Sequence, residues 1–95
     1  MSELIDQAVA TLNAKVTEPF SATAKFVIGE EGTIMLDSNG ARAGDEEADV
    51  TLTADADTFK EILAGDTNPT AAFMTGKLSV DGDMGLAMML GNVLG

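Results

Sequence analysis

The hydrophobic positions near the N-terminus follow the period of an α-helix. They form one stripe along a helix surface: Leu4, Ile5, Ala8, Val9 and Leu12. Ser2 is placed to cap the start of this helix, and Pro19 marks its end. We therefore expect an amphipathic helix to open the fold.

From Phe20 the pattern alternates, as in strands with one buried face. Residues 20–28 place an apolar side chain at every second position, and residues 33–37 do the same at Ile34 and Leu36. A short turn at residues 29–32 would join these two strands. Asn39-Gly40 is a strong hairpin signal and predicts a brief third strand at residues 41–43. The segment at residues 44–49, which is rich in acidic side chains, then predicts a solvated surface turn.

The pattern in the second half of the chain predicts a strand, two helices, a further strand and a last helix, in that order. Residues 50–54 alternate again, and Asp55 or Asp57 would cap a helix that ends at Gly65. A short helix at residues 71–75 follows Asn68-Pro69, and residues 77–81 form a fifth strand. This order predicts one α+β domain over residues 1–95, with helices gathered on one face of the sheet.

The predicted last helix, residues 84–94, lacks the polar face that an ordinary surface helix needs. It carries no charge, and Asn92 is its one strongly polar side chain. A partner subunit, another part of the fold or an apolar ligand must cover its second face. Four methionines occur on this helix or shortly before it in the chain: Met74, Met84, Met88 and Met89. Methionine is adaptable, so the cluster suits a pocket with variable guests, or else it fills gaps in the core.

Charge and composition exclude most other classes of function. The net charge is −11, which disfavours nucleic-acid binding and repels anionic membranes. The chain has no His, Cys, Trp or Tyr, so the usual base and thiolate nucleophile are absent. Asp81-Gly82-Asp83 begins like a calcium loop but lacks the later ligands of one. We predict no catalytic residue, no metal site and no cofactor.

The ends of the chain predict a cytoplasmic protein. An acidic start replaces the basic region of a signal peptide, and residues 84–95 are about half the length that spans a bilayer.

Residues 65–78, continuing through residues 82–90, resemble a sterol carrier protein type 2 domain. Residues 48–53 with the helix at Thr58-Phe59 also resemble the family, and the hairpin at residues 26–40 fits more loosely. The chain lacks the Trp often found after the family's double-glycine turn, and it lacks the tail of the eukaryotic members. It is therefore expected to be a stand-alone member of prokaryotic type.

This resemblance implies a five-stranded mixed sheet of order 3-2-1-4-5, with an apolar tunnel between sheet and helices. It also implies non-catalytic binding of fatty acids, acyl-CoA, phospholipids or sterols, and transfer or presentation of them. The residues that the resemblance places near the tunnel are Phe59, Ile62, Leu63, Phe73, Met74, Met84, Leu86, Met88, Met89, Leu90 and Val93.

Two other readings of the apolar last helix stay open. In the first, it docks on a second copy of the chain or on another protein, and no lipid enters. In the second, the domain assists an enzyme that processes acyl substrates. The acidic balance is in either case compatible with a role in solubility or salt adaptation.

Overall fold

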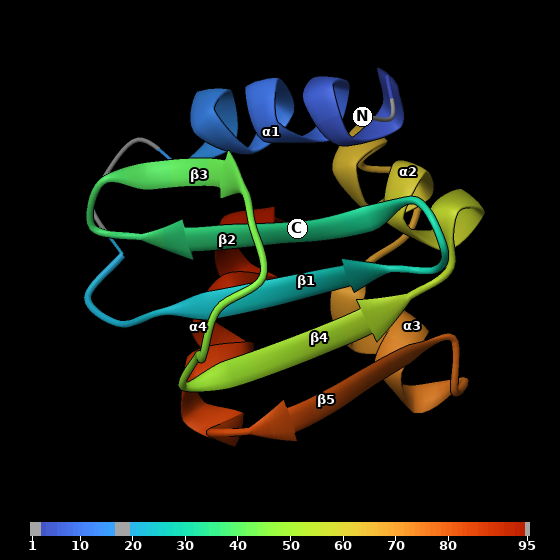
Figure 1. Cartoon of the computed structure of the whole chain (residues 1–95). Helices are drawn as coiled ribbons and strands as arrows, with labels where there is room; N and C mark the ends of the chain where they lie inside the picture. Colours follow the sequence, from blue (N-terminus) through green and yellow to red (C-terminus); the bar gives the residue numbers. More distant parts are fainter. Residues whose placement is uncertain (1–2, 17–19, 95) are drawn as a thin grey trace.

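The alternating segments of the sequence form one five-stranded sheet, and four helices accompany it (Figure 1). The computed structural model describes residues 3–16 and 20–94, the last three of these as backbone only. The elements are α1 (Glu3–Lys15), β1 (Ala24–Ile28), β2 (Gly32–Asp37), β3 (Gly40–Ala43), β4 (Val50–Ala54), α2 (Ala56–Ala64), α3 (Pro69–Met74), β5 (Leu78–Gly82) and α4 (Met84–Leu94).

The strands lie in the order β3-β2-β1-β4-β5, which confirms the predicted mixed sheet. β1 and β4 are parallel, and every other neighbouring pair is antiparallel. Phe26 of β1 therefore stands opposite Leu52 of β4, which stands opposite Val80 of β5. Because these three residues share a face, the register places one apolar row beneath the helices.

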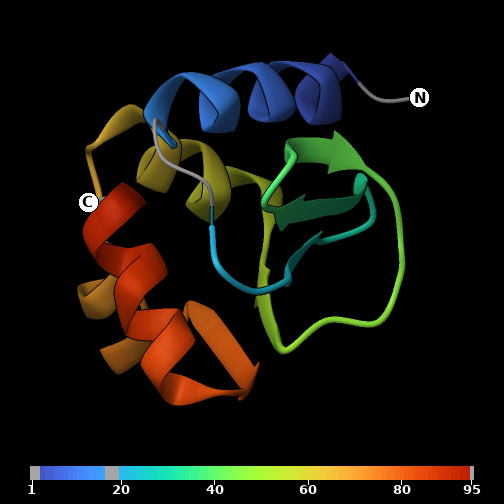
Figure 2. The ribbon, with the colours of Figure 1, turned by 90° about the vertical axis from the view of Figure 1, so that its left-hand side faces the viewer.

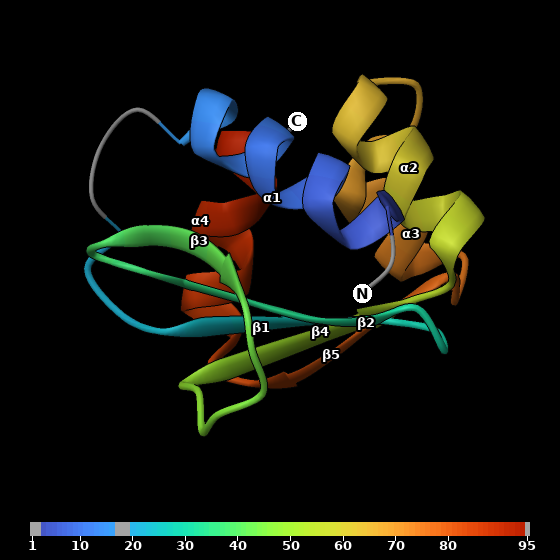
Figure 3. The same ribbon diagram turned by 45° about the horizontal axis from the view of Figure 1, so that its top comes forward.

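The helices lie on one face of the sheet and enclose the core (Figure 3). Inward residues of α1 (Ile5, Ala8 and Leu12) are buried, as the helical spacing predicts. The rings of Phe26 and Phe59 meet with their centroids 5.7 Å apart, which joins α2 to the middle of the sheet. Figures 1 and 2 place β5 at the edge of the molecule opposite α1.

The other face of the sheet is crossed by the acidic segment between β3 and β4 (Figure 3). This segment is largely exposed, as predicted, but it also covers Met35, which is fully buried on this face. Lys25 binds Asp45 at 2.9 Å, and Arg42 binds both Asp37 (2.7 Å) and Glu46 (3.0 Å). The Arg42 guanidinium beside Asp37 lowers the pKa of that carboxyl.

Capping side chains fix where three of the helices begin. The Thr58 N–H donates to Asp55 Oδ1 at 2.7 Å, and this bond lowers the pKa of Asp55. Asn68 Oδ1 accepts from the Thr70 N–H at 2.8 Å. Asp83 Oδ1 accepts from the N–H of Leu86 at 3.1 Å. Gly65 ends α2 in the left-handed conformation, with φ of 84°, as predicted.

The first strand begins later than its alternation predicts. β1 starts at Ala24 rather than at Phe20, and just before it Thr23 is bound mainly to Asp49, with a longer bond of 3.4 Å from the Val50 N–H to the Thr23 carbonyl. The Thr23 N–H donates to Asp49 Oδ2 at 3.0 Å, and the Thr23 carbonyl accepts from the Asp49 N–H at 2.9 Å. The chain bends there, and Phe20 reaches the core from outside the sheet.

Other boundaries differ from the prediction or lie outside the described residues. α3 starts at Pro69, two residues early, because Asn68 caps it directly. The predicted cap Ser2 and the predicted stop Pro19 lie outside the described residues.

Candidate functional site

A cavity of about 290 Å³ opens between α3, α4 and the edge of the sheet. We call it the methionine groove. Its lining consists of Leu52, Pro69, Thr70, Phe73, Met74, Leu78, Val80, Met84, Ala87, Met88 and Gly91.

The sheet supplies the floor of the groove. Leu52 and Val80 stand opposite each other on β4 and β5, and Leu78 lies two residues along β5 on the same face. β5 is an edge strand, so the groove runs along the border of the sheet. The apolar side chains on this face of β4 and β5 therefore form the floor of an open cavity at the border of the core.

α4 supplies one wall because it has two apolar faces. Met84, Ala87, Met88 and Gly91 recur at helical spacing and line the groove. Leu86 and Leu90 point to the core instead, where Leu90 is fully buried. Since one face packs in the core and the other lines a cavity, the missing polar face of this helix has a structural explanation.

α3 supplies the opposite wall, and its large apolar side chains are exposed. Phe73 is 41% exposed and Met74 is 79% exposed, while Met88 across the groove is 72% exposed. Large apolar side chains gathered at one cavity mark a site of binding more often than isolated exposed ones do. The wall is held in place by the Asn68 cap at the start of α3.

The structure divides the residues predicted to lie near a tunnel. Phe73, Met74, Met84 and Met88 line the methionine groove. Phe59, Ile62, Leu63 and Leu90 lie in the hydrophobic core, and Leu86 packs against that core. Met89 is 47% exposed and lies outside the groove lining. The side chain of Val93 lies outside the described residues. The part of each in binding a lipid stays a prediction.

Seven lining residues were not among the predicted site residues. Two signals could have found most of them. Leu52, Leu78 and Val80 follow the alternation of their strands, and Ala87 and Gly91 lie three and seven residues after Met84. Pro69 and Thr70 give no such signal, because their sequence predicts the start of a helix and not the wall of a cavity.

The groove offers almost no polar chemistry. Among the lining residues whose side chains the structure describes, the hydroxyl of Thr70 is the single polar side-chain group. Across residues 3–16 and 20–94, the structure brings together no group of three or more potential metal ligands. In the same ranges, no helix is both long enough and apolar enough to cross a membrane.

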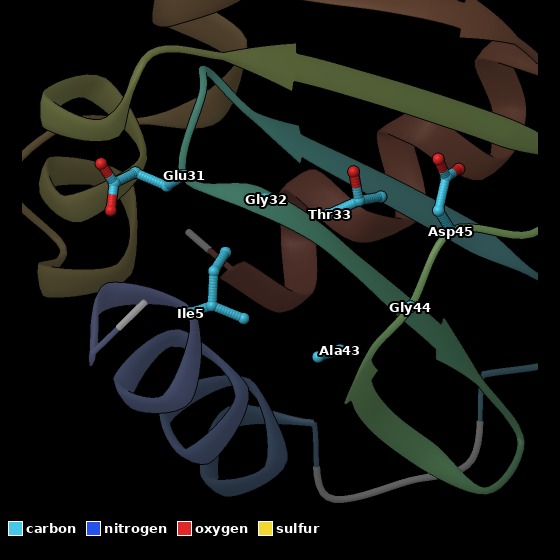
Figure 4. Close-up of a pocket in the computed structure, with 7 residues that line it drawn as sticks. All are labelled: Ile5, Glu31, Gly32, Thr33, Ala43, Gly44 and Asp45. Atoms are coloured by element: carbon cyan, nitrogen blue, oxygen red, sulfur yellow. The ribbon is translucent and has the colours of Figure 1, made fainter. Parts of the chain in front are cut away.

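A second cavity, of about 330 Å³, lies between the start of α1 and the β2–β3 side of the sheet (Figure 4). It is lined by Ile5, Glu31, Gly32, Thr33, Ala43, Gly44 and Asp45. Ile5 is its one large apolar side chain, and Asp45 is already paired with Lys25. This cavity is therefore less suited to an aliphatic guest than the methionine groove.

Relatives with similar sequences include two types of longer protein. Hydroxysteroid dehydrogenase-like protein 2 from Xenopus laevis is 37% identical, over 90% of this chain and 22% of its own length. Sterol carrier protein 2 from Homo sapiens is 41% identical, over 68% of this chain and 13% of its own length. The chain thus spans less than a quarter of these curated relatives.

A solved structure and a family profile point to the same relationship. The solution structure of sterol carrier protein 2 from Aedes aegypti, in complex with palmitate, superposes with a TM-score of 0.79 at 23% identity. The match covers 99% of this chain and 96% of that one, so the two share a fold. The sequence profile of the SCP-2 sterol transfer family matches residues 2–95. The resemblance inferred from residues 65–90 is therefore confirmed, and the chain belongs to the SCP-2 sterol transfer family.

Proposed function

We propose that this protein binds a lipid in the methionine groove and does not alter it chemically. The observation that carries the proposal is the set of large apolar side chains exposed around one cavity: Phe73, Met74, Met84 and Met88. An aliphatic chain in the groove would cover them. The lining residues that the structure describes carry no carboxylate, amine or thiol, which supports binding rather than reaction.

Burial of methylene groups would drive the affinity. Each buried methylene contributes about 0.8 kcal/mol, so ten of them give roughly 8 kcal/mol before ordering costs. The groove, at about 290 Å³, is at the small end of the range for ligand cavities. A single aliphatic chain therefore suits it better than a bulky ligand, and flexible Met side chains can adapt to its length.

The family supports this proposal. The relatives include sterol carrier protein 2, and the superposed Aedes aegypti protein is in complex with palmitate. The net charge of −11 argues against docking on anionic membranes, so we propose that the lipid is taken up and presented in solution.

Titration with ligands of different tail length tests the proposal. A sixteen-carbon monoacyl ligand should bind at least about tenfold more tightly than its eight-carbon analogue, because it buries more methylene groups. Calorimetry or chemical shifts of the methionine methyl groups would measure this. Equal binding of the two ligands, or no binding of either, would refute the proposal. An empty dimer in solution that separates when Met84 and Met88 are made polar would favour a protein interface instead.

A further inference from the structure

The charges around the methionine groove indicate which lipid heads it accepts. We propose that the groove selects single-chain lipids with an uncharged polar head and discriminates against anionic heads. This inference rests on the proposed function, since it concerns the same site.

No basic side chain lies in the lining of the groove. The five basic residues are Lys15, Lys25, Arg42, Lys60 and Lys77, and none of them is among the lining residues. Lys25 and Arg42 are paired with carboxylates on the opposite face of the sheet. An anionic head would therefore find no ion-pair partner in the lining.

The remaining basic residues also lie outside the lining. Lys15 ends α1, which packs on β3 and β2 at the other edge of the sheet. Lys60 is exposed on α2. Lys77 is exposed, and although it adjoins Leu78 of the groove in sequence, it is not among the lining residues.

The start of α4, next to Met84, already holds a carboxylate of the chain. Free N–H groups at the start of a helix favour an anion. Here Asp83 Oδ1 accepts from the Leu86 N–H at 3.1 Å and occupies that position. An anionic head at this end of the groove would meet the charge of Asp83 and the net charge of −11. An uncharged head meets neither penalty, and the Thr70 hydroxyl can both donate to it and accept from it.

Three probes with the same twelve-carbon tail test the inference: monolauroylglycerol, laurate and lauroyl-CoA. At low ionic strength we expect the uncharged glyceride to bind best, laurate about threefold more weakly and lauroyl-CoA at least about tenfold more weakly. The differences should shrink in about 0.5 M salt, because screening weakens the repulsion. Calorimetry below the critical micelle concentration measures all three.

A charge-removing variant makes the test local. Asp83→Asn keeps a side chain that caps helices well but removes the charge. It should strengthen binding of laurate and lauroyl-CoA about two- to threefold and leave the glyceride unchanged. Asp6→Asn makes the same exchange on the exposed side of α1, over the opposite edge of the sheet, and should have a smaller effect.

The outcomes separate the two proposals. Equal affinities of all three probes, or tighter binding of the anions, overturn the head-group inference and leave lipid binding intact. No binding of any probe overturns both. If Asp83→Asn does not fold, the salt dependence measured on the unmodified chain still decides the inference.

Discussion

Helices α2 and α4 lie on the same face of one sheet, yet they use their apolar side chains differently. α2 has one apolar side, and its large residues there (Phe59, Ile62 and Leu63) are buried. Its other side carries charges such as Lys60 and Glu61, which are exposed. α4 buries Leu90 in the core but leaves Met84 and Met88 exposed.

The difference shows which apolar residues folding requires. In α2 the core buries all three of these large apolar side chains. In α4 the apolar side chains exceed what the core can bury, and two of the exposed ones, Met84 and Met88, line the methionine groove. An excess of apolar surface without a partner in the fold is therefore what marks the methionine groove as the candidate site.

The largest contrast should come from two phenylalanines, one in each setting. Phe59 is 3% exposed and packs on Phe26, whereas Phe73 is 41% exposed at the groove. Phe59→Ala should destabilise the fold by about 3–5 kcal/mol, because it leaves a cavity in the core. Phe73→Ala should change stability by less than about 1 kcal/mol and weaken lipid binding instead. Urea denaturation and ligand titration measure the two effects. Similar losses of stability in both variants would remove the distinction between core and groove.

Most of the fold could be predicted from the sequence because the local patterns agree with one another. Alternation placed β4 at its observed bounds, and Asn39-Gly40 predicted the turn before β3. The start of β1 could not be predicted in this way. Phe20 fits the alternation, but Asp49, far along the chain, binds the backbone of Thr23 just before the strand begins.

The candidate site was harder to predict than the fold. The family resemblance implies that Ile62 and Met88 both lie near the tunnel, and spacing alone cannot tell whether an apolar side chain faces the core or a cavity. The structure places Ile62 in the core and Met88 in the groove. The relative position of α3 and α4 decides this, and it depends on contacts between distant segments rather than on local pattern.

Two neighbouring methionines of α4 give a sharper test of the groove. Met88 lines it and is 72% exposed, while Met89 is 47% exposed and lies outside the lining. Met88→Asp should fold, because its charge stays in water in the free protein. It should weaken lipid binding at least about tenfold, because a bound tail would bury that charge without a partner.

Met89→Asp is the matched control, with the same change of side chain and of net charge. It should bind within about twofold of the unmodified chain at high salt, where long-range repulsion is screened. Titration of both variants with the sixteen-carbon ligand measures the difference. If Met88→Asp binds normally, Met88 is not part of the site.

The smallest effect should separate the two glycines within α4. An added Cβ at Gly91 would lie 3.8 Å from Thr70 Oγ1, an ordinary contact, whereas at Gly85 it would lie 3.1 Å from Asp83 Oδ1 and crowd the cap. Gly91→Ala should therefore gain most of the helix preference of alanine, up to about 1 kcal/mol, and Gly85→Ala should gain less. Because Gly91 lines the groove, its methyl group should also weaken lipid binding slightly, and the Gly85 variant should not share that loss. Thermal unfolding measures the stability of the two variants, and ligand titration measures their binding. A Gly91→Ala variant that is stabilised and also binds lipid more tightly would contradict the prediction.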